Sequence, residues 1–139
     1  MNDRRKEIDL LIEQFWKRGY LTLSRKYGTY LPEPSNIGGF EVDIIARQKD
    51  NYAIGLTLDQ TDLHDNTLIN RLRYLATRQT KNSNKKVLLF VGVSKTDFSS
   101  AKKLLNSIEE DIRKNIRLFL IEERADQKPI RRQEKILFS

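Results

Sequence analysis

Apolar side chains recur at helical spacing close to the N-terminus. Positions three or four apart carry Ile8, Leu11, Ile12, Phe15 and Trp16. Such a stripe is typical of an amphipathic helix that buries one face, and we predict one over residues 4–18. Gly19 follows directly, at the place where a glycine in the left-handed conformation commonly ends a helix.

Alternating and β-branched residues then predict three strands. Residues 20–25 alternate between apolar and polar side chains and indicate a strand, whereas the residues 28–39, rich in proline and glycine, indicate a loop. Residues 40–47 and 52–58 are rich in strand-forming side chains, and the polar residues 48–51 between them predict a turn. These two strands therefore form a hairpin.

Helices and strands alternate in the second half of the chain. Apolar residues at helical spacing predict helices over 62–80 and 97–113. Residues 87–93 form a continuous apolar run, typical of a central strand buried on both faces of a sheet, and residues 116–121 add a last strand. Because a helix connects these two strands, we expect them to be parallel.

The order α-β-β-β-α-β-α-β predicts an α/β fold in which a mixed sheet is flanked by helices, in three layers. At 139 residues the chain is short enough for one domain, which we place at residues 1–122. Residues 123–139 form a charged C-terminal tail that ends in the apolar residues Ile136, Leu137 and Phe138.

Composition narrows the class of protein. Charged residues make up 32% of the chain, and no window approaches the roughly 18 uninterrupted apolar residues of a membrane helix. The apolar positions near the N-terminus are interrupted by Glu7, Asp9 and Glu13, which a secretion signal would not tolerate. The absence of cysteine excludes disulfides and thiolate chemistry. We therefore expect a cytoplasmic protein that binds no membrane.

Positive charge is concentrated in one segment. The net charge is +7, and residues 66–96 contain seven Lys or Arg and no Asp or Glu, while the rest of the chain is neutral overall. We expect this segment to contact the phosphates of a nucleic acid, most readily DNA. The candidate contacts are Arg71, Arg73, Arg78, Lys81, Lys85 and Lys86. The alternative is a solvated helix face and loop.

Few residues suit catalysis. The sequence lacks the common nucleotide-binding and hydrolase motifs, and His64 is its only histidine. Glu41 and Asp43 are two apart on the predicted strand 40–47, so their carboxylates should project from the same face. Paired carboxylates of this kind often hold a hard cation such as Mg²⁺. The alternative is a solvent-facing surface of an edge strand.

The predicted element order and one short motif resemble the restriction-endonuclease-like, PD-(D/E)xK nuclease superfamily. The motif is the sequence GGFEVDIIAR at residues 38–47, and it is most similar to small Holliday-junction-resolvase-like proteins. The resemblance implies that Asp43 binds Mg²⁺ and that an acid-x-Lys pair on the next strand supplies a second ligand and a cation. It also implies a helper glutamate on the first helix, where Glu7 matches and Glu13 is the second choice.

The next strand departs from that family pattern. The acid-x-Lys pair should fall at residues 55–57 or 56–58, which read Gly-Leu-Thr and Leu-Thr-Leu and contain neither an acid nor a lysine. Asp59 is a possible replacement acid, and Lys81 or Lys86 a possible migrated lysine. The alternative is that Asp59 is only the polar end of a strand. Without these groups, a lone Asp43 would bind Mg²⁺ weakly.

Three functions follow from these observations. The first is a nucleic-acid-binding protein on a restriction-endonuclease-like fold with a degraded, inactive metal site. The second is a Mg²⁺-dependent DNA endonuclease with a rearranged site built from Asp43, Asp59 and Glu41. The third is a non-enzymatic, homodimeric protein-interaction module. We favour the first, because the missing acid-x-Lys pair is read directly from the residues.

Overall fold

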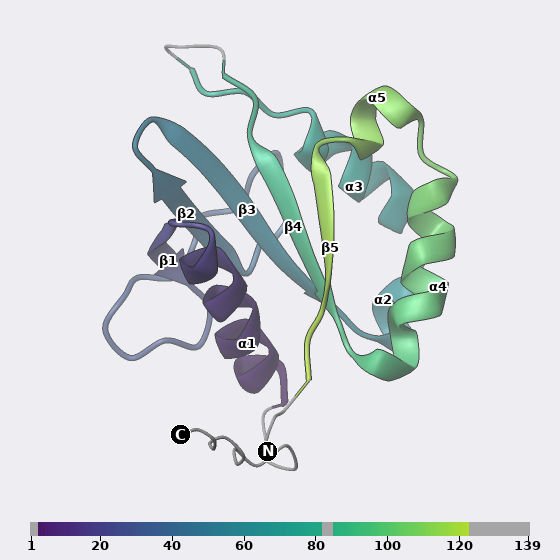
Figure 1. The fold of residues 1–139 in the computed structure, drawn as a ribbon, viewed down its shortest axis with the longest axis horizontal. Coiled ribbons are helices and arrows are strands. Elements are labelled where there is room, and N and C mark those ends of the chain that lie inside the picture. The colour runs from purple at the N-terminus through teal and green to yellow at the C-terminus, as the bar shows by residue number, and fades with distance from the viewer. Residues whose placement is uncertain (1–2, 82–84, 123–139) are drawn as a thin grey trace, which may run out of the picture.

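The computed structural model describes residues 3–81 and 85–122, and its ribbon is drawn in Figure 1. The predicted tail at 123–139 lies outside the described residues. The elements are α1 (Asp3–Lys17), β1 (Leu21–Arg25), β2 (Ile44–Gln48), β3 (Asn51–Leu58), α2 (Gln60–His64), α3 (Leu68–Ala76), β4 (Leu88–Val93), α4 (Lys95–Asn106), α5 (Glu110–Arg113) and β5 (Ile116–Leu120).

The strands form one mixed, open sheet in the order β1-β2-β3-β4-β5. The first three strands pair antiparallel, and β3, β4 and β5 pair parallel. The predicted hairpin is confirmed, because Gln48 pairs with Asn51 across a two-residue turn. The predicted α/β class with a mixed sheet is therefore confirmed.

Helix α1 covers one face of this sheet (Figure 1). Its buried side chains include Phe15, whose ring stacks on that of Phe90 with centroids 4.3 Å apart. Gly19 ends the helix with φ +86°, as predicted. Trp16, however, is 63% exposed and not part of the buried stripe, because it is rotated about 100° around the helix from Phe15.

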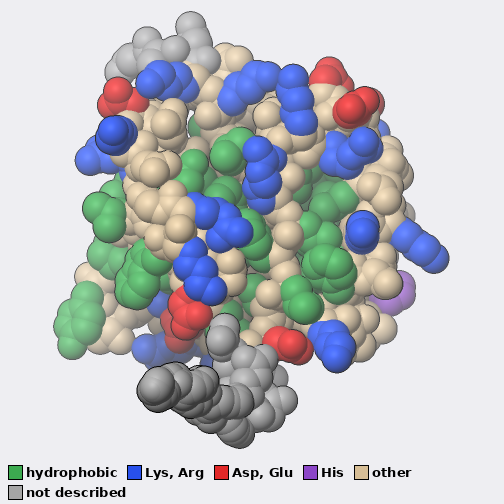
Figure 2. Space-filling model, in the orientation of Figure 1, with side chains coloured by type: hydrophobic (Ala, Val, Ile, Leu, Met, Phe, Trp, Pro, Cys, Tyr) green, Lys and Arg blue, Asp and Glu red, His purple; other side chains and the backbone are tan. Residues whose placement is uncertain are grey.

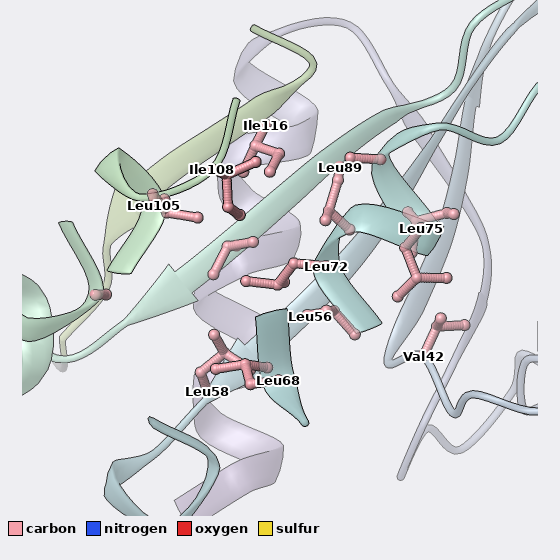
Figure 3. Close-up of a cluster of buried hydrophobic side chains, with 14 of the residues drawn as sticks. Val42, Leu56, Leu58, Leu68, Leu72, Leu75, Leu89, Leu105, Ile108 and Ile116 are labelled. Atoms are coloured by element: carbon pink, nitrogen blue, oxygen red, sulfur yellow. The ribbon is translucent and has the colours of Figure 1, made fainter. Parts of the chain in front are cut away.

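The opposite face is covered by α3, α4 and the segment after α4, as Figure 3 shows. Side chains from these helices meet those of β3 and β4 in a second apolar core. Its labelled members are Val42, Leu56, Leu58, Leu68, Leu72, Leu75, Leu89, Leu105, Ile108 and Ile116. Strand β4 contributes to both cores, which confirms the prediction that it is buried on both faces.

Both helices predicted in the second half are interrupted. The predicted helix 62–80 is two helices, α2 and α3, because the Asp65 carboxylate accepts hydrogen bonds from the backbone N–H and hydroxyl of Thr67 (2.9 and 2.8 Å). Such local bonds compete with helix continuation. The predicted helix 97–113 is also two helices, α4 and α5. The first ends just before Ser107, whose hydroxyl donates to a carbonyl of the last α4 turn (2.6 Å).

Among the described residues, no helix combines the length and apolarity needed to cross a bilayer.

Candidate functional site

Asp43 is a buried carboxylate next to the end of β3. Only 2% of the residue is exposed, and its Oδ2 accepts hydrogen bonds from the backbone N–H of Thr57 (2.7 Å) and from the Thr57 hydroxyl (2.9 Å). The Asp43 N–H in turn donates to the Gly55 carbonyl (3.0 Å). Two donors from one buried threonine therefore satisfy one oxygen of this carboxylate.

Arg4, in the first turn of α1, brings three further carboxylates to the same place. Its Nη1 lies 3.7 Å from Asp43 Oδ2. Its Nη2 lies 3.4 Å from Asp59 Oδ2 and 3.3 Å from Asp62 Oδ2, and its Nε lies 4.0 Å from Glu7 Oε1. One guanidinium thus neutralises part of the charge of four acids.

The electrostatics of this Arg4 cluster (Arg4, Glu7, Asp43, Asp59 and Asp62) follow from its partial burial. Burial alone would lower the pKa of Arg4, but the attraction of the four carboxylates outweighs it and raises that pKa above its ordinary value. The hydrogen bond from the Asp62 backbone lowers the pKa of Asp59, whereas burial raises the pKa of Asp62.

Asp59 also has a structural role. It is the N-cap of α2, where its side chain accepts from the Asp62 N–H (2.9 Å) and the Asp62 side chain accepts from the Asp59 N–H (2.9 Å). Such a capping box satisfies two backbone donors that the helix leaves unpaired. The position after β3 is therefore used to begin a helix.

Glu41 does not join the cluster. The prediction that Glu41 and Asp43 share one face of a strand is wrong, because β2 begins only at Ile44 and both acids precede it. The Glu41 side chain is 66% exposed and pairs with Lys26, whose hydrogen bond lowers the pKa of Glu41. Glu13 is exposed on α1, about 14 Å along the helix from Arg4.

The arrangement does not fit a Mg²⁺ ion. In the described parts of the chain no group of three or more His, Cys, Asp or Glu side chains is arranged to hold a metal. Gly55, the first position expected for the second acid, lies under α1, and a Cβ there would be 2.9 Å from the Ile44 Cβ and 3.0 Å from the Phe15 ring. A carboxylate at 55 has no room, and Arg4 supplies the cation that the acids require.

The basic residues singled out in the sequence have different contacts in the structure. Arg73 pairs with Glu109 (3.0 Å), and Lys85 with Asp50 (3.8 Å). The Arg71 guanidinium donates to the Glu41 carbonyl (3.1 Å). The Lys86 side chain is exposed, and the Lys86 backbone forms an isolated β-bridge with that of Gln79. Arg78 and Lys81 line one cavity together with two further basic side chains, whereas Lys86 lines another cavity with Lys114.

The cavity that Arg78 and Lys81 line is a groove of about 690 Å³ between the β2–β3 turn and the segment that follows α3. Among the described residues that line it, the basic ones are Arg47, Lys49, Arg78 and Lys81, and Asp50 is the one acid. Figure 2 shows Lys and Arg side chains along the end of the molecule where this turn lies. We call this cavity the basic groove.

Sequence reasoning missed Arg47 and Lys49, although both flank the turn that it predicted. They line the same groove as Arg78 and Lys81 because β3 and β4 are parallel, with Ala53 opposite Leu88. Parallel strands begin at the same edge of a sheet, so the segments that precede β3 and β4 lie together. The sign of the charge was visible in the sequence, but the strand pairing was not.

The basic groove and the Arg4 cluster lie at opposite ends of the sheet. Asp43 precedes β2 and Lys49 follows it, a separation of about 20 Å at the rise of an extended strand. Lys81 lines the basic groove, so it does not act as a migrated lysine beside Asp43.

Comparison of the chain with protein-family models, with curated proteins and with solved structures returned no match.

Proposed function

We propose that this chain is a nucleic-acid-binding protein on a restriction-endonuclease-like fold whose metal site has been lost. The basic groove carries the proposal. Four basic side chains from two segments of the chain line it, against one acid whose charge is offset by Lys85. Predominantly positive charge in a concave site attracts a polyanion such as a nucleic acid.

The available charge in the basic groove strengthens this proposal. Within the described residues, Arg47, Lys49, Arg78 and Lys81 form no ion pair, in contrast to Arg73 and Lys85. The Arg78 guanidinium is held by the Tyr74 backbone carbonyl (2.9 Å) and by its ring, whose centroid is 3.7 Å from Cζ. It is therefore positioned without being neutralised, which favours contact with a phosphate.

The loss of the metal site is proposed from the Arg4 cluster. In the family that the sequence resembles, the position of Asp43 binds Mg²⁺, whereas here its Oδ2 faces Arg4 and Thr57. The element order and the placement of Asp43 beside β3 support a restriction-endonuclease-like fold. The absent second acid and the arginine beside Asp43 support a binding protein over a nuclease.

Binding is tested by fluorescence anisotropy with labelled DNA at several salt concentrations. We expect the logarithm of affinity to fall with the logarithm of salt concentration, with a slope of about −3.6 on duplex DNA and about −2.8 on single strands, as four phosphate contacts predict. The double variant Arg47→Glu/Lys49→Glu should weaken binding more than tenfold and reduce the slope by about half. Lys102→Glu/Lys103→Glu on α4 changes the net charge equally and should have a smaller effect, because both lysines lie outside the groove.

A third variant separates the basic groove from the wider basic segment. Arg71→Glu/Arg73→Glu reverses two charges on α3 that already have protein partners. It should weaken binding less than the groove variant. Failure of every oligonucleotide to bind at low salt would overturn the proposal, and an equal loss in all three variants would remove the groove from it.

The inactive site is tested by cleavage of labelled linear and four-way-junction DNA with Mg²⁺ or Mn²⁺. We expect no cleavage by the wild-type protein. Metal-dependent cleavage that disappears in Asp43→Ala would show that the protein is a nuclease with a rearranged site, and would overturn this part of the proposal.

A second candidate function is a homodimeric interaction module. It is favoured by Trp16 and Leu21, which are 63% and 70% exposed where α1 is followed by the edge strand β1. Exposed apolar side chains beside unpaired strand groups are typical of association surfaces. Light scattering tests this candidate: a dimer that Leu21→Lys converts to a monomer would support it.

A further inference from the structure

The basic groove has an apolar wall as well as basic side chains. Ile45, Tyr52, Ile54 and Val87 line it from β2, β3 and the segment before β4. This wall is on the sheet face opposite α1, because the residue pair Ala46 and Ala53 belongs to the core beneath α1 and strand side chains alternate. The groove therefore offers a phosphate-binding rim and an apolar surface in one site.

Tyr52 gives this wall an aromatic ring. The side chain is half-buried, and no ring or cation contact of Tyr52 is present among the described aromatic residues. Tyr52 lies directly opposite Arg47 in the β2–β3 ladder, so the Cβ atoms are about 5 Å apart on the same face. A stacking surface and a cation thus stand side by side.

Duplex and single-stranded nucleic acids would use such a groove differently. In a duplex the bases are paired and stacked inside, so its phosphates could meet the rim but its bases could not cover the wall. In a single strand the bases are unpaired, and they stack on aromatic side chains while basic groups follow the backbone. A cavity of about 690 Å³ is within the range that encloses a small organic ligand.

We propose that the basic groove receives an unpaired nucleotide of a single-stranded nucleic acid, with its base against Tyr52 and the adjacent phosphates at Arg47 and Lys49. The proposal rests on the proposed function and specifies its ligand. Arg78 and Lys81 face the same ligand from the segment after α3. Because Tyr52 would contact the base and the basic side chains would contact the phosphates, substitutions can remove the two contributions to the binding affinity independently.

The experiment compares a labelled oligothymidine with a duplex of equal length by fluorescence anisotropy. The stacking variant is Tyr52→Leu, which keeps an apolar side chain and removes the ring. We expect it to weaken single-strand binding about tenfold, as the loss of one stacked base predicts, and to leave duplex binding unchanged. Tyr30→Leu is the matched control, because Tyr30 is 95% exposed in the loop between β1 and β2.

A second measurement uses the wild-type protein and does not depend on how Tyr52→Leu folds. An oligonucleotide containing a photoreactive halogenated uracil is irradiated with the protein, and the cross-linked residue is identified by mass spectrometry. We expect the cross-link at Tyr52 or in the adjacent groove segments.

The outcomes separate this inference from the proposed function. If no nucleic acid binds, both fail. A second outcome is that duplex and single strand bind equally, that Arg47→Glu/Lys49→Glu weakens the binding of both, and that Tyr52→Leu weakens neither. In that case nucleic-acid binding stands and the single-strand site is overturned. The site is also overturned if Tyr30→Leu weakens single-strand binding while Tyr52→Leu does not, or if the cross-link forms in the β1–β2 loop. Either result would place the stacked base at that loop.

Discussion

Arg4 Nη1 lies 3.7 Å from Asp43 Oδ2, so that a residue of the first helical turn provides a cation to a carboxylate buried beside the sheet. The two residues are brought together because α1 packs across the sheet through Phe15 and begins at the edge where β3 ends. The geometry makes Asp43 part of an ion-pair network that Arg4 connects.

Removing the cation should destabilise the fold. Arg4→Ala leaves the buried Asp43 carboxylate without a nearby positive charge, and we expect the free energy of unfolding to fall by about 2 kcal/mol. Arg5→Ala, an exposed residue of the same turn, should change it by less than about 0.5 kcal/mol. Urea unfolding measures both variants, and equal values for the two would contradict the role assigned to Arg4.

The Thr57 hydroxyl makes a separable contribution. Thr57→Val keeps the shape of the side chain and the backbone N–H bond to Asp43 but removes the hydroxyl bond, so we expect a loss of about 1 kcal/mol in the free energy of unfolding. Asp43→Ala should cost about 2 to 3 kcal/mol, because it also leaves the threonine donors without their buried acceptor. In the double variant Asp43→Ala/Thr57→Val, the loss in the free energy of unfolding should be smaller than the sum of the two single losses. Both substitutions remove the same hydrogen bond, from the Thr57 hydroxyl to Asp43.

Gly55 should not tolerate a side chain. A Cβ at this position would lie 2.9 Å from the Ile44 Cβ, so Gly55→Ala is expected to lower the free energy of unfolding by about 2 kcal/mol. Introducing an acid with Gly55→Asp should cost more and should not produce metal-dependent cleavage. A stable, metal-binding Gly55→Asp protein in calorimetry would refute this account of the site.

Lys49 holds a strained conformation at the β2–β3 turn, with φ +56°. Lys49→Gly should therefore raise the free energy of unfolding by about 1 kcal/mol while weakening nucleic-acid binding, since it removes a charge from the basic groove. Asp50→Gly, at the neighbouring turn position without a positive φ, should give no such gain. Opposite changes in thermal stability and affinity for Lys49→Gly are the signature to look for.

The two acids of the α2 capping box should have opposite effects on the free energy of unfolding as the pH falls. The pKa of Asp59 is lowered in the folded state, so its stabilisation is present above about pH 4 and is lost as the pH falls through that folded value. The pKa of Asp62 is raised, so protonation of Asp62 instead adds stability as the pH falls.

Variants of these two acids should therefore change the acid dependence in opposite directions. Asp59→Asn should make the loss of stability between about pH 5 and pH 3 shallower, and Asp62→Asn should make it steeper. Urea midpoints across this range provide the measurement. The same slope in both variants and the wild type would show that the capping box does not govern the acid response.

The hydrophobic pattern by itself determined the elements and the class of the fold. The stripe around Phe15, the hairpin at residues 48–51 and the apolar run of β4 each specify a local structure, because helix and strand periodicities differ. The pattern did not predict where side-chain hydrogen bonds to the backbone interrupt a helix. The bonds of Asp65 and Ser107 lie between helices that the pattern predicted as continuous.

Only the tertiary structure decided which charges meet. Arg4 lies beside Asp43, 39 positions away, because of how α1 packs, and Lys49 lines the same groove as Lys81 because β3 and β4 are parallel. Neither long-range arrangement has a periodic signal in the sequence. Periodicity specifies how neighbours along the chain fold, whereas contacts between distant charges depend on helix packing and strand pairing, which set the positions of the side chains in space.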